Sequence, residues 1–446
     1  MEAAQTIPDA QRRRLTTRSS AQLLAQRLRA ARERTLSLAA DLTGAQLLGP
    51  RLAIVNPPLW EIAHVGWFQE YWCLRFRGDN EFAPSLVPGA DALYNSALVA
   101  HETRWSLPLL PFDAMLRFLD EVLNRVMDRL QREPANPALL YFAELAAAHE
   151  EMHNEAYTYT RQTHAYAAPR GDIRSVPAGR SMPGDVALPG GEYWLGARRG
   201  DHFVFDNERW EHAVALKPFE IARAAVTNRQ FSEFVDDNGY GRRELWCDEG
   251  WQWRCEANAE APAYWLKDAG GWQQRVYDKV VALAPHTAVI HVNWYEADAW
   301  CRWAGRRLPS EAEWEQAAAT SPLDPGGSDG KRVCPWGGGA ADIGHANLYS
   351  ALGAVAPVSE FAAGDSAWGC RQMLGNVWEW TADWFHPYPG FERDPYAEYS
   401  EPWFGNHKIL RGGCFATSAA LLRATWRNFY TPDRRDVFAG FRSCAA

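Results

Sequence analysis

Two histidines, His149 and His153, lie four residues apart in the string His149-Glu150-Glu151-Met152-His153. On a helix, residues at i and i+4 lie one above the other on the same face, so the two imidazoles can bind one metal ion. The string also matches H-E-x-x-H, in which zinc proteases use the glutamate as a general base. A single inward histidine is usually a core residue, hydrogen-bonded to a carbonyl or carboxylate group. The pair therefore fits either two core histidines or two metal ligands, and a third ligand would decide between chemistries.

The residues around the pair predict a helix. Asn136 can cap it, Pro137 suits its first turn, and no further proline occurs before Pro169. One face of this helix carries both histidines together with Phe142, Leu145, Ala146, Met152 and Ala156. Both imidazoles are therefore expected to point inward, where a polar ring needs a partner and a metal ion would supply one.

The composition of the whole chain is that of an ordinary globular protein. It has 446 residues, 47% hydrophobic and 23% charged, which suggests two or three domains with ample buried core. A net charge of −9 argues against a nucleic-acid partner or a polybasic membrane surface. No apolar run approaches 18 residues, and none follows Arg12-Arg13-Arg14 to make a signal peptide. The eight cysteines are scattered without a C-x-x-C pair, so we expect free thiols and a cytoplasmic protein.

The first half of the chain reads as helices. Amphipathic patterns predict helices over 17–43, from Asn56-Pro57-Pro58 onward, over about 112–131, and through the histidine pair. The second of these places Trp60, His64, Trp67 and Tyr71 on one face. Four such helices predict a four-helix bundle that can hold a metal ion between its inner side chains. The long connection from about 76 to 108, which contains Arg104, is expected to be functional.

The second half has a different character. Residues 170–186 are rich in Arg, Gly, Pro and Ser, which predicts a linker, and a flexible tail is expected at 1–15. Beyond 187 the chain is dense in tryptophan and glycine, with short strands, many turns and helices over 296–303 and 310–319. No repeat is present, so this half is predicted to be α+β with irregular loops. The expected domains are a helical bundle over 16–169 and an α+β domain over 187–446.

Five strings give this second half a resemblance to a known family. They are Pro189-Gly190-Gly191-Glu192-Tyr193-Trp194-Leu195-Gly196, Val226-Thr227-Asn228, Arg307-Leu308-Pro309-Ser310-Glu311-Ala312-Glu313-Trp314-Glu315, Gly375-Asn376-Val377-Trp378-Glu379-Trp380 and Leu410-Arg411-Gly412-Gly413. Together they resemble the formylglycine-generating-enzyme (sulfatase-modifying-factor) type of domain, a variant of the C-type-lectin fold. Their expected role is structural, as buried tryptophans and turn glycines.

The first half resembles the DinB-like metal-binding bundle. That bundle followed by this second domain is the layout of the ergothioneine-type sulfoxide synthases and of selenoneine synthase. The resemblance covers nearly the whole chain after residue 15. It implies an Fe(II) ion bound by His64, His149 and His153, with O2 as co-substrate. It also implies hercynine (trimethylhistidine) as the substrate, coupled at its ring carbon to sulfur or selenium.

The resemblance further implies residues for substrate chemistry. Tyr396, in Pro395-Tyr396-Ala397-Glu398-Tyr399-Ser400, matches the family's proton donor. Aromatic faces suit the trimethylammonium group, and Asn428 matches a residue that binds the substrate carboxylate. The residues expected to bind substrates are Tyr399, Asn428, Phe429, Tyr430, Arg434, Arg104 and Met152.

This chain departs from the ergothioneine enzymes at three places. Their R-N-W-D is here Arg427-Asn428-Phe429-Tyr430, their second loop arginine is missing after Arg104, and their H-x-x-Q-H carries Met152. The lost acid and arginine belong to the side that binds a zwitterionic thiol donor, and charged donors need charge-assisted partners. We therefore predict a less charged donor, the selenosugar of selenoneine synthase, with a cysteine-derived thiol as the alternative. An H-E-x-x-H zinc hydrolase, a zinc-dependent thiol transferase and a lectin-like binding protein are rival hypotheses.

Overall fold

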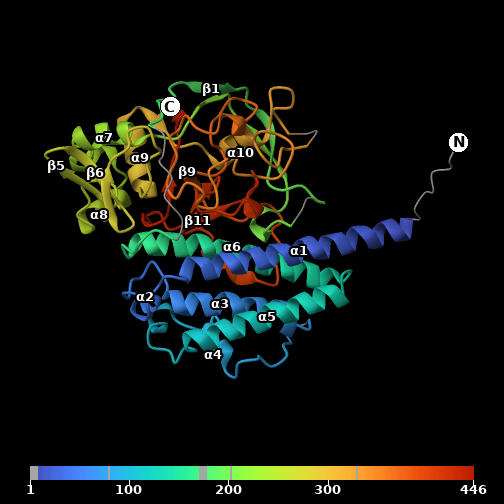
Figure 1. Ribbon diagram of the computed structural model, residues 1–446. Helices are drawn as coiled ribbons and strands as arrows, with labels where there is room; N and C mark the ends of the chain where they lie inside the picture. Colours follow the sequence, from blue (N-terminus) through green and yellow to red (C-terminus); the bar gives the residue numbers. More distant parts are fainter. Residues whose placement is uncertain (1–8, 79–80, 170–177, 201–202, 328–329) are drawn as a thin grey trace. The chain divides into compact units, whose positions relative to one another are not determined.

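The computed structural model describes residues 9–78, 81–169, 178–200, 203–327 and 330–446, without the side chains of 9–19 (Figure 1). The chain divides into two compact units, Met1–Thr160 and Arg161–Ala446, which are described here one at a time. In the described part of the chain, no helix is both long enough and apolar enough to cross a membrane.

The first unit is built from helices, and the four long ones lie alongside one another in Figure 1. Its elements are α1 (Asp9–Ala39), α2 (Gly44–Leu48), α3 (Pro58–Glu70), the π-helix η1 (Tyr71–Arg75), α4 (Ala90–Tyr94), η2 (His101–Thr103), α5 (Phe112–Arg132) and α6 (Pro137–Thr163). The four helices predicted from the sequence are confirmed as α1, α3, α5 and α6. The described residues of the long connection between η1 and α5 include two short helices, α4 and η2.

The N-termini of α6 and α3 are formed in different ways. At α6 the prediction is confirmed, because Asn136 Oδ1 accepts a hydrogen bond from the backbone N–H of Leu139. Helix α3 begins at Pro58, and Pro57 rather than Asn56 occupies its cap position. The side chain of Asn56 instead accepts a hydrogen bond from Arg104 Nη1 at 2.6 Å. A local pattern could not foresee that the amide would be used by a residue 48 positions along the chain.

Helix α3 packs closely against α5. A Cβ atom at Gly66 would lie 2.3 Å from Leu119 Cδ2 and 3.3 Å from Phe118 Cε1, so a larger residue at this crossing would force the Leu119 side chain or the helices to move. Nearly every side chain of α3 is buried, and one face of α5 is buried as well, namely Met115, Leu119, Val122, Val126 and Leu130. His64 lies on the same helix, two residues before Gly66 and next to this crossing.

The second unit combines short helices with four small sheets. Its α-helices are α7 (Asn228–Asp236), α8 (Asp248–Glu256), α9 (Trp294–Trp303) and α10 (Glu311–Ala319); its strands are β1 (Asp185–Leu188), β2 (Gly191–Leu195), β3 (His212–Leu216), β4 (Phe219–Ala222), β5 (Trp265–Asp268), β6 (Gly271–Val276), β7 (Lys279–Ala282), β8 (Arg306–Arg307), β9 (Trp378–Trp384), β10 (Lys408–Arg411), β11 (Asn428–Tyr430), β12 (Ala439–Gly440) and β13 (Cys444–Ala445). The strand orders are β1-β4-β13-β8, β11-β10-β9-β12, β2-β3 and β5-β6-β7. The helices predicted over 296–303 and 310–319 are confirmed as α9 and α10.

The family strings of this unit form its core, as predicted. Ser310 caps α10, and the buried indole of Trp314 in that helix donates a hydrogen bond to Glu379 of β9 at 2.7 Å. Arg411 at the end of β10 is fully buried and pairs with Glu311 and Glu315 of α10. The hydrogen bond and the ion pairs together join three strings that are far apart in the sequence, so the role of these strings here is structural.

The expected domain limits fall partly outside the described residues. Residues 1–8 of the expected tail are not described, and α1 already begins at Asp9. Residues 170–177 of the expected linker are likewise not described, and β1 begins within its last two residues. The proposed limits at 15/16, 169/170 and 186/187 therefore stay predictions.

Candidate metal centre

Three histidine side chains of the first unit converge between two of its helices. His64 comes from α3, and His149 and His153 come from adjacent turns of α6. One nitrogen from each ring lies within 4.8 Å of the others, and the ring centroids are 4.5–5.1 Å apart. This is the only such group of three or more histidine, cysteine or carboxylate ligands among the residues that the structure describes.

Hydrogen bonds fix the orientation of two of these rings. His64 Nδ1 lies 2.7 Å from the carbonyl oxygen of Tyr94, and His153 Nδ1 lies 2.5 Å from Glu61 Oε1. A carbonyl or ionised carboxylate oxygen can only accept, so each Nδ1 carries the hydrogen. The Nε2 lone pairs of His64 and His153 are then the ones available to a metal ion.

The rings of His64 and His149 are neutral at physiological pH. Burial lowers the pKa of His64 well below its usual value, and the neighbouring His153 lowers it further. Burial likewise lowers the pKa of His149, with smaller contributions from His153 and His64. His149 also stacks on Phe68 with ring centroids 3.7 Å apart. Neutral imidazoles are the form that binds metals, so this cluster is suited to a divalent ion.

The donor set indicates which chemistry such an ion could perform. Three neutral nitrogen ligands would leave further coordination positions of such an ion open to substrates. This resembles the open sites of non-haem iron oxygenases, with a third imidazole in place of the carboxylate. The His64, His149 and His153 side chains therefore fit a catalytic metal site better than a closed structural one.

The glutamate of the H-E-x-x-H string has another role in this fold. Glu150 is buried and accepts hydrogen bonds from Arg32 Nε at 2.7 Å and from Thr35 Oγ1 at 2.8 Å, both on α1. A zinc protease needs this carboxylate free to act on a metal-bound water. Here Glu150 joins α6 to α1, which argues against the zinc-hydrolase hypothesis.

Arg104, predicted to bind substrate, is 8% exposed and used in protein contacts. Its guanidinium lies over the Trp60 ring at 3.9 Å, and it donates hydrogen bonds to Asn56 and to the carbonyl oxygen of Val99. Burial lowers the pKa of Arg104 to about 10, a shift opposed by the negative charge of Glu61. This places Arg104 in the electrostatic surroundings of the histidine cluster.

The predicted substrate residues of the second unit gather around β11. The Phe429 ring stacks on Phe385 with centroids 4.1 Å apart and meets Tyr399 edge-on at 5.8 Å. Tyr396 and Tyr399 have ring centroids 6.2 Å apart. Burial raises the pKa of both tyrosines above the usual value, so both phenols stay protonated at neutral pH.

The loop that carries Tyr396 is held at both ends by one carboxylate. Asp206, which is buried, accepts a hydrogen bond from Ser400 Oγ through Oδ1 and from the backbone N–H of Asp394 through Oδ2. Asn207 also donates a hydrogen bond to Ser400 at 3.0 Å. The segment 394–400 is therefore clamped to η3 (Asp206–Glu208).

The remaining predicted residues lie at three places. Asn428 and Tyr430 are half-buried at the two ends of β11, and Asn428 Oδ1 accepts a hydrogen bond from the N–H of Phe429. The Arg434 guanidinium lies 5.0 Å from the Tyr430 ring centroid and makes two hydrogen bonds with Asp436. Met152 lies on α6, half-buried, immediately before His153.

Two residues that hold predicted site residues, or the loop that carries one, were not themselves predicted from the sequence. Glu61 lies in an otherwise apolar stretch, three positions before His64, and a buried acid at that spacing was a signal that could have been used. Asp206 offered no comparable signal, because its partners lie 188 and 194 residues away.

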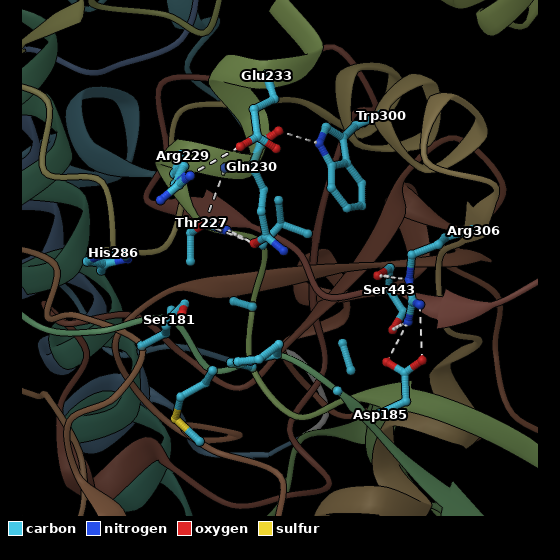
Figure 2. Close-up of a pocket in the computed structure, with 18 residues that line it drawn as sticks. Ser181, Asp185, Thr227, Arg229, Gln230, Glu233, His286, Trp300, Arg306 and Ser443 are labelled. Carbon is cyan, nitrogen blue, oxygen red and sulfur yellow. Dashed lines mark hydrogen bonds and ion pairs between the residues drawn. The ribbon is translucent and has the colours of Figure 1, made fainter.

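A hollow of the second unit, shown in Figure 2, contains none of the predicted site residues. Its volume is about 450 Å³, and the residues that line it include Ala222, Ala224, Ala225 and Val226. Figure 2 shows the Asp185–Arg306 ion pair on one side and the cap of α7 at Thr227 on another. These polar groups are paired with one another, as expected of a structural surface.

Comparisons with known proteins agree with this two-part organisation. The sulfatase-modifying factor enzyme 1-like domain matches residues 170–446, and the DinB superfamily matches residues 27–157. A hercynine oxygenase of Mycolicibacterium thermoresistibile is 38% identical, with 94% of each chain covered. Hercynine oxygenases of Mycolicibacterium smegmatis and Mycobacterium tuberculosis are each 36% identical and cover 94% and 95% of this chain, and 97% and 99% of their own.

The resemblance and the two-domain α+β fold class inferred from the sequence are both confirmed. The chain belongs to the hercynine oxygenase family of ergothioneine-type sulfoxide synthases, in which a DinB-like helical domain precedes a sulfatase-modifying-factor-type domain.

Proposed function

We propose that this chain is a non-haem iron enzyme that uses O2 to join the imidazole ring carbon of hercynine to selenium. The donor is a selenosugar, and the product is a selenoxide on the way to selenoneine. The alternative donor is a cysteine-derived thiol, which would give a sulfoxide. The observation that carries the proposal is the convergence of three imidazole nitrogens, two from buried rings and one from a half-buried ring, within 4.8 Å of one another. Relatives named hercynine oxygenase, aligned over 94% of the chain, support hercynine as substrate.

His64, His149 and His153 would hold the Fe(II) ion. When bound, the ion would supply redox chemistry with O2 and favour ionisation of the chalcogen donor. The overall reaction is balanced by one O2. Hercynine loses its ring C–H hydrogen and the donor its Se–H or S–H hydrogen, and these leave as water with one oxygen atom. The other oxygen remains on selenium or sulfur, and the four electrons that reduce O2 come from the new carbon–chalcogen bond and from oxidation of the chalcogen.

Side chains of the protein would bind hercynine and supply a proton to the reaction. Tyr396 would give its phenolic proton to a reduced oxygen, because its raised pKa keeps it protonated at neutral pH. The faces of Phe429 and Tyr399 would receive the trimethylammonium group. The Asn428 side chain already uses its oxygen on the N–H of Phe429, so its Nδ2 is the donor proposed for the substrate carboxylate.

The pairing of two predicted substrate-binding arginines, one in each unit, supports a donor of low charge. The Arg434 guanidinium is neutralised by two hydrogen bonds with Asp436. The Arg104 guanidinium is held by Asn56, Val99 and the Trp60 face. Neither cation has the free fork that binds a carboxylate group with two hydrogen bonds. A sugar donor needs no such partner, whereas a zwitterionic thiol does.

The test is anaerobic loading with Fe(II), addition of hercynine and one donor, exposure to air, and mass spectrometry of the product. Selenium and sulfur products differ in mass and isotope pattern. We expect product with the selenosugar, with one iron per chain. His149→Ala should lose both iron and product, whereas His164→Ala, just beyond the end of α6, should keep both. Absence of product with every donor in fully loaded protein would refute the proposal, and product from His149→Ala would refute the ligand set.

The proposed role of Tyr396 is tested separately. Tyr396→Phe should retain iron and hercynine binding and lose at least about 100-fold in turnover, the usual contribution of a positioned proton donor. Tyr349→Phe, at a phenol of the same unit that is 37% exposed, is the matched control and should behave as the unaltered chain. Unchanged turnover in Tyr396→Phe would eliminate its role as proton donor.

A further inference from the structure

The metal ligands of this chain are oriented by unlike partners. His64 Nδ1 donates to a neutral backbone carbonyl, that of Tyr94, at 2.7 Å. His153 Nδ1 donates to a carboxylate, that of Glu61, at 2.5 Å. Glu61 is 1% exposed and lies on α3, one turn before His64. Glu61 and His64 thus lie on the same helix, α3. The side chain of Glu61, however, binds His153, which comes from α6.

We propose that Glu61 is a positioning residue of the metal centre, which presents the Nε2 of His153 to the ion and supplies the negative charge that three neutral imidazoles lack. This inference rests on the proposed function only for the existence of the metal site, and it assigns a role to a residue outside the three ligands.

The first part of the role is orientation. The Glu61 oxygen accepts the Nδ1–H of His153, which excludes the tautomer with a hydrogen on Nε2. The bond also restrains ring rotation, because it spans 92 residues and joins α3 to α6. Partners of this kind behind a ligand histidine are worth about 10- to 100-fold in metal affinity.

The second part of the role is charge. A divalent ion bound by three neutral ligands keeps its double positive charge in a buried site, and buried charge is costly unless it is compensated. Nearby acids are already used by arginines, Glu150 by Arg32 and Glu151 by Arg27. The Glu61 carboxylate is hydrogen-bonded directly to a ligand ring, so its charge acts on the ion through His153.

A competing role for Glu61 is to balance Arg104, whose charge it also opposes. The two roles predict different results. If Glu61 serves Arg104 alone, its replacement changes the stability of the metal-free protein and leaves metal affinity unchanged. If it serves the metal centre, affinity falls, while the metal-free protein loses a buried charge and is destabilised little.

The experiment measures Co(II) and Fe(II) binding to the full chain under anaerobic conditions. The dissociation constants come from competition with a chromogenic chelator, and the Co(II) absorption spectrum reports ligand geometry. Glu61→Gln keeps the size of the side chain and removes the charge, and we expect affinity to fall at least tenfold with an altered Co(II) spectrum. Glu61→Asp keeps the charge and should restore part of the affinity.

The matched control is Glu70→Gln. Glu70 is an equally buried acid of α3, but it accepts hydrogen bonds from Ser85 and from the backbone N–H of Leu86. We expect this variant to bind Co(II) within about twofold of the unaltered chain. Urea unfolding of each metal-free variant separates loss of affinity from loss of fold.

The outcomes are distinguishable. If the unaltered chain binds no Co(II) or Fe(II), or binds it equally after His149→Ala, the metal site and with it the proposed function fail. If the unaltered chain binds one ion through His149 and Glu61→Gln binds as tightly with the same spectrum, only the role of Glu61 is overturned. An affinity loss equal in Glu61→Gln and Glu70→Gln would also overturn it, since the effect would then belong to any buried acid of α3.

Discussion

Replacing Gly66 by alanine tests whether the crossing of α3 and α5 positions His64. The added Cβ would lie 2.3 Å from Leu119 Cδ2 and 3.3 Å from Phe118 Cε1, whereas carbon atoms normally pack at about 3.5–4.0 Å. Leu119 is 1% exposed and has little room to withdraw. The helices must therefore separate or the leucine must leave its rotamer.

The expected magnitude is the balance of two opposing effects. Overpacking a core site costs typically about 1–3 kcal/mol. Alanine in place of a mid-helix glycine contributes about 1 kcal/mol in the other direction. We therefore expect Gly66→Ala to lower the free energy of unfolding by about 0–2 kcal/mol, with a middle value of about 1 kcal/mol. Because His64 lies two residues away, Co(II) affinity should fall several-fold as well.

Urea unfolding of the metal-free protein and Co(II) titration measure the two effects. Gly44→Ala is the matched control, since no atom lies within 4 Å of the Cβ that it adds. In a Leu119→Ala background the clash is absent, so Gly66→Ala should there be neutral or stabilising. If Gly66→Ala has the same effect in both backgrounds, the close contact with Leu119 does not control this crossing and the reasoning is refuted.

Three further predictions concern the second unit. Arg427→Met leaves the buried Glu311 without one of its paired cations and should lower the free energy of unfolding by about 3–5 kcal/mol in a urea titration; a change below about 1 kcal/mol would contradict this. Burial lowers the pKa of His291 to about 3, so its contribution to stability is complete above the unfolded value of about 6.5 and is lost as pH falls toward 3. The free energy of unfolding should thus fall by about 2 kcal/mol between pH 7.5 and pH 5. Urea unfolding of His291→Asn, a substitution that suits the positive φ of this position, should lack that part of the pH dependence. Asp206→Ala frees both ends of the loop that carries Tyr396, and it should reduce product formation at least tenfold while iron loading measured by mass spectrometry stays complete; unchanged turnover would show that the clamp is dispensable.

Local patterns predicted the helices that carry the metal site. The i, i+4 spacing of His149 and His153 and the cap at Asn136 depend on neighbours within two turns, and the structure has both on α6. The outward or inward position of single residues was harder to infer. Leu23 and Leu24 are adjacent leucines of α1, yet the first is 63% exposed and the second 6%.

The contacts that complete the site could not be read from local spacing. The bond from His153 to Glu61 spans 92 residues, and the bonds of Glu150 to Arg32 and Thr35 span 118 and 115. One sequence does not say which distant polar groups meet, because the choice depends on how whole helices pack. For the same reason the H-E-x-x-H string was compatible with a hydrolase until the structure placed its glutamate against α1.

The Asp206 clamp has a consequence for protein engineering. The geometry of the short segment 394–400 is specified by a side chain nearly two hundred positions upstream, through contacts that span 188 and 194 residues. A chimera that exchanges only this segment between relatives would transfer Tyr396 without Asp206, the residue that holds its loop in place. Loop transplants intended to change donor preference should therefore carry the η3 turn with them as a single module.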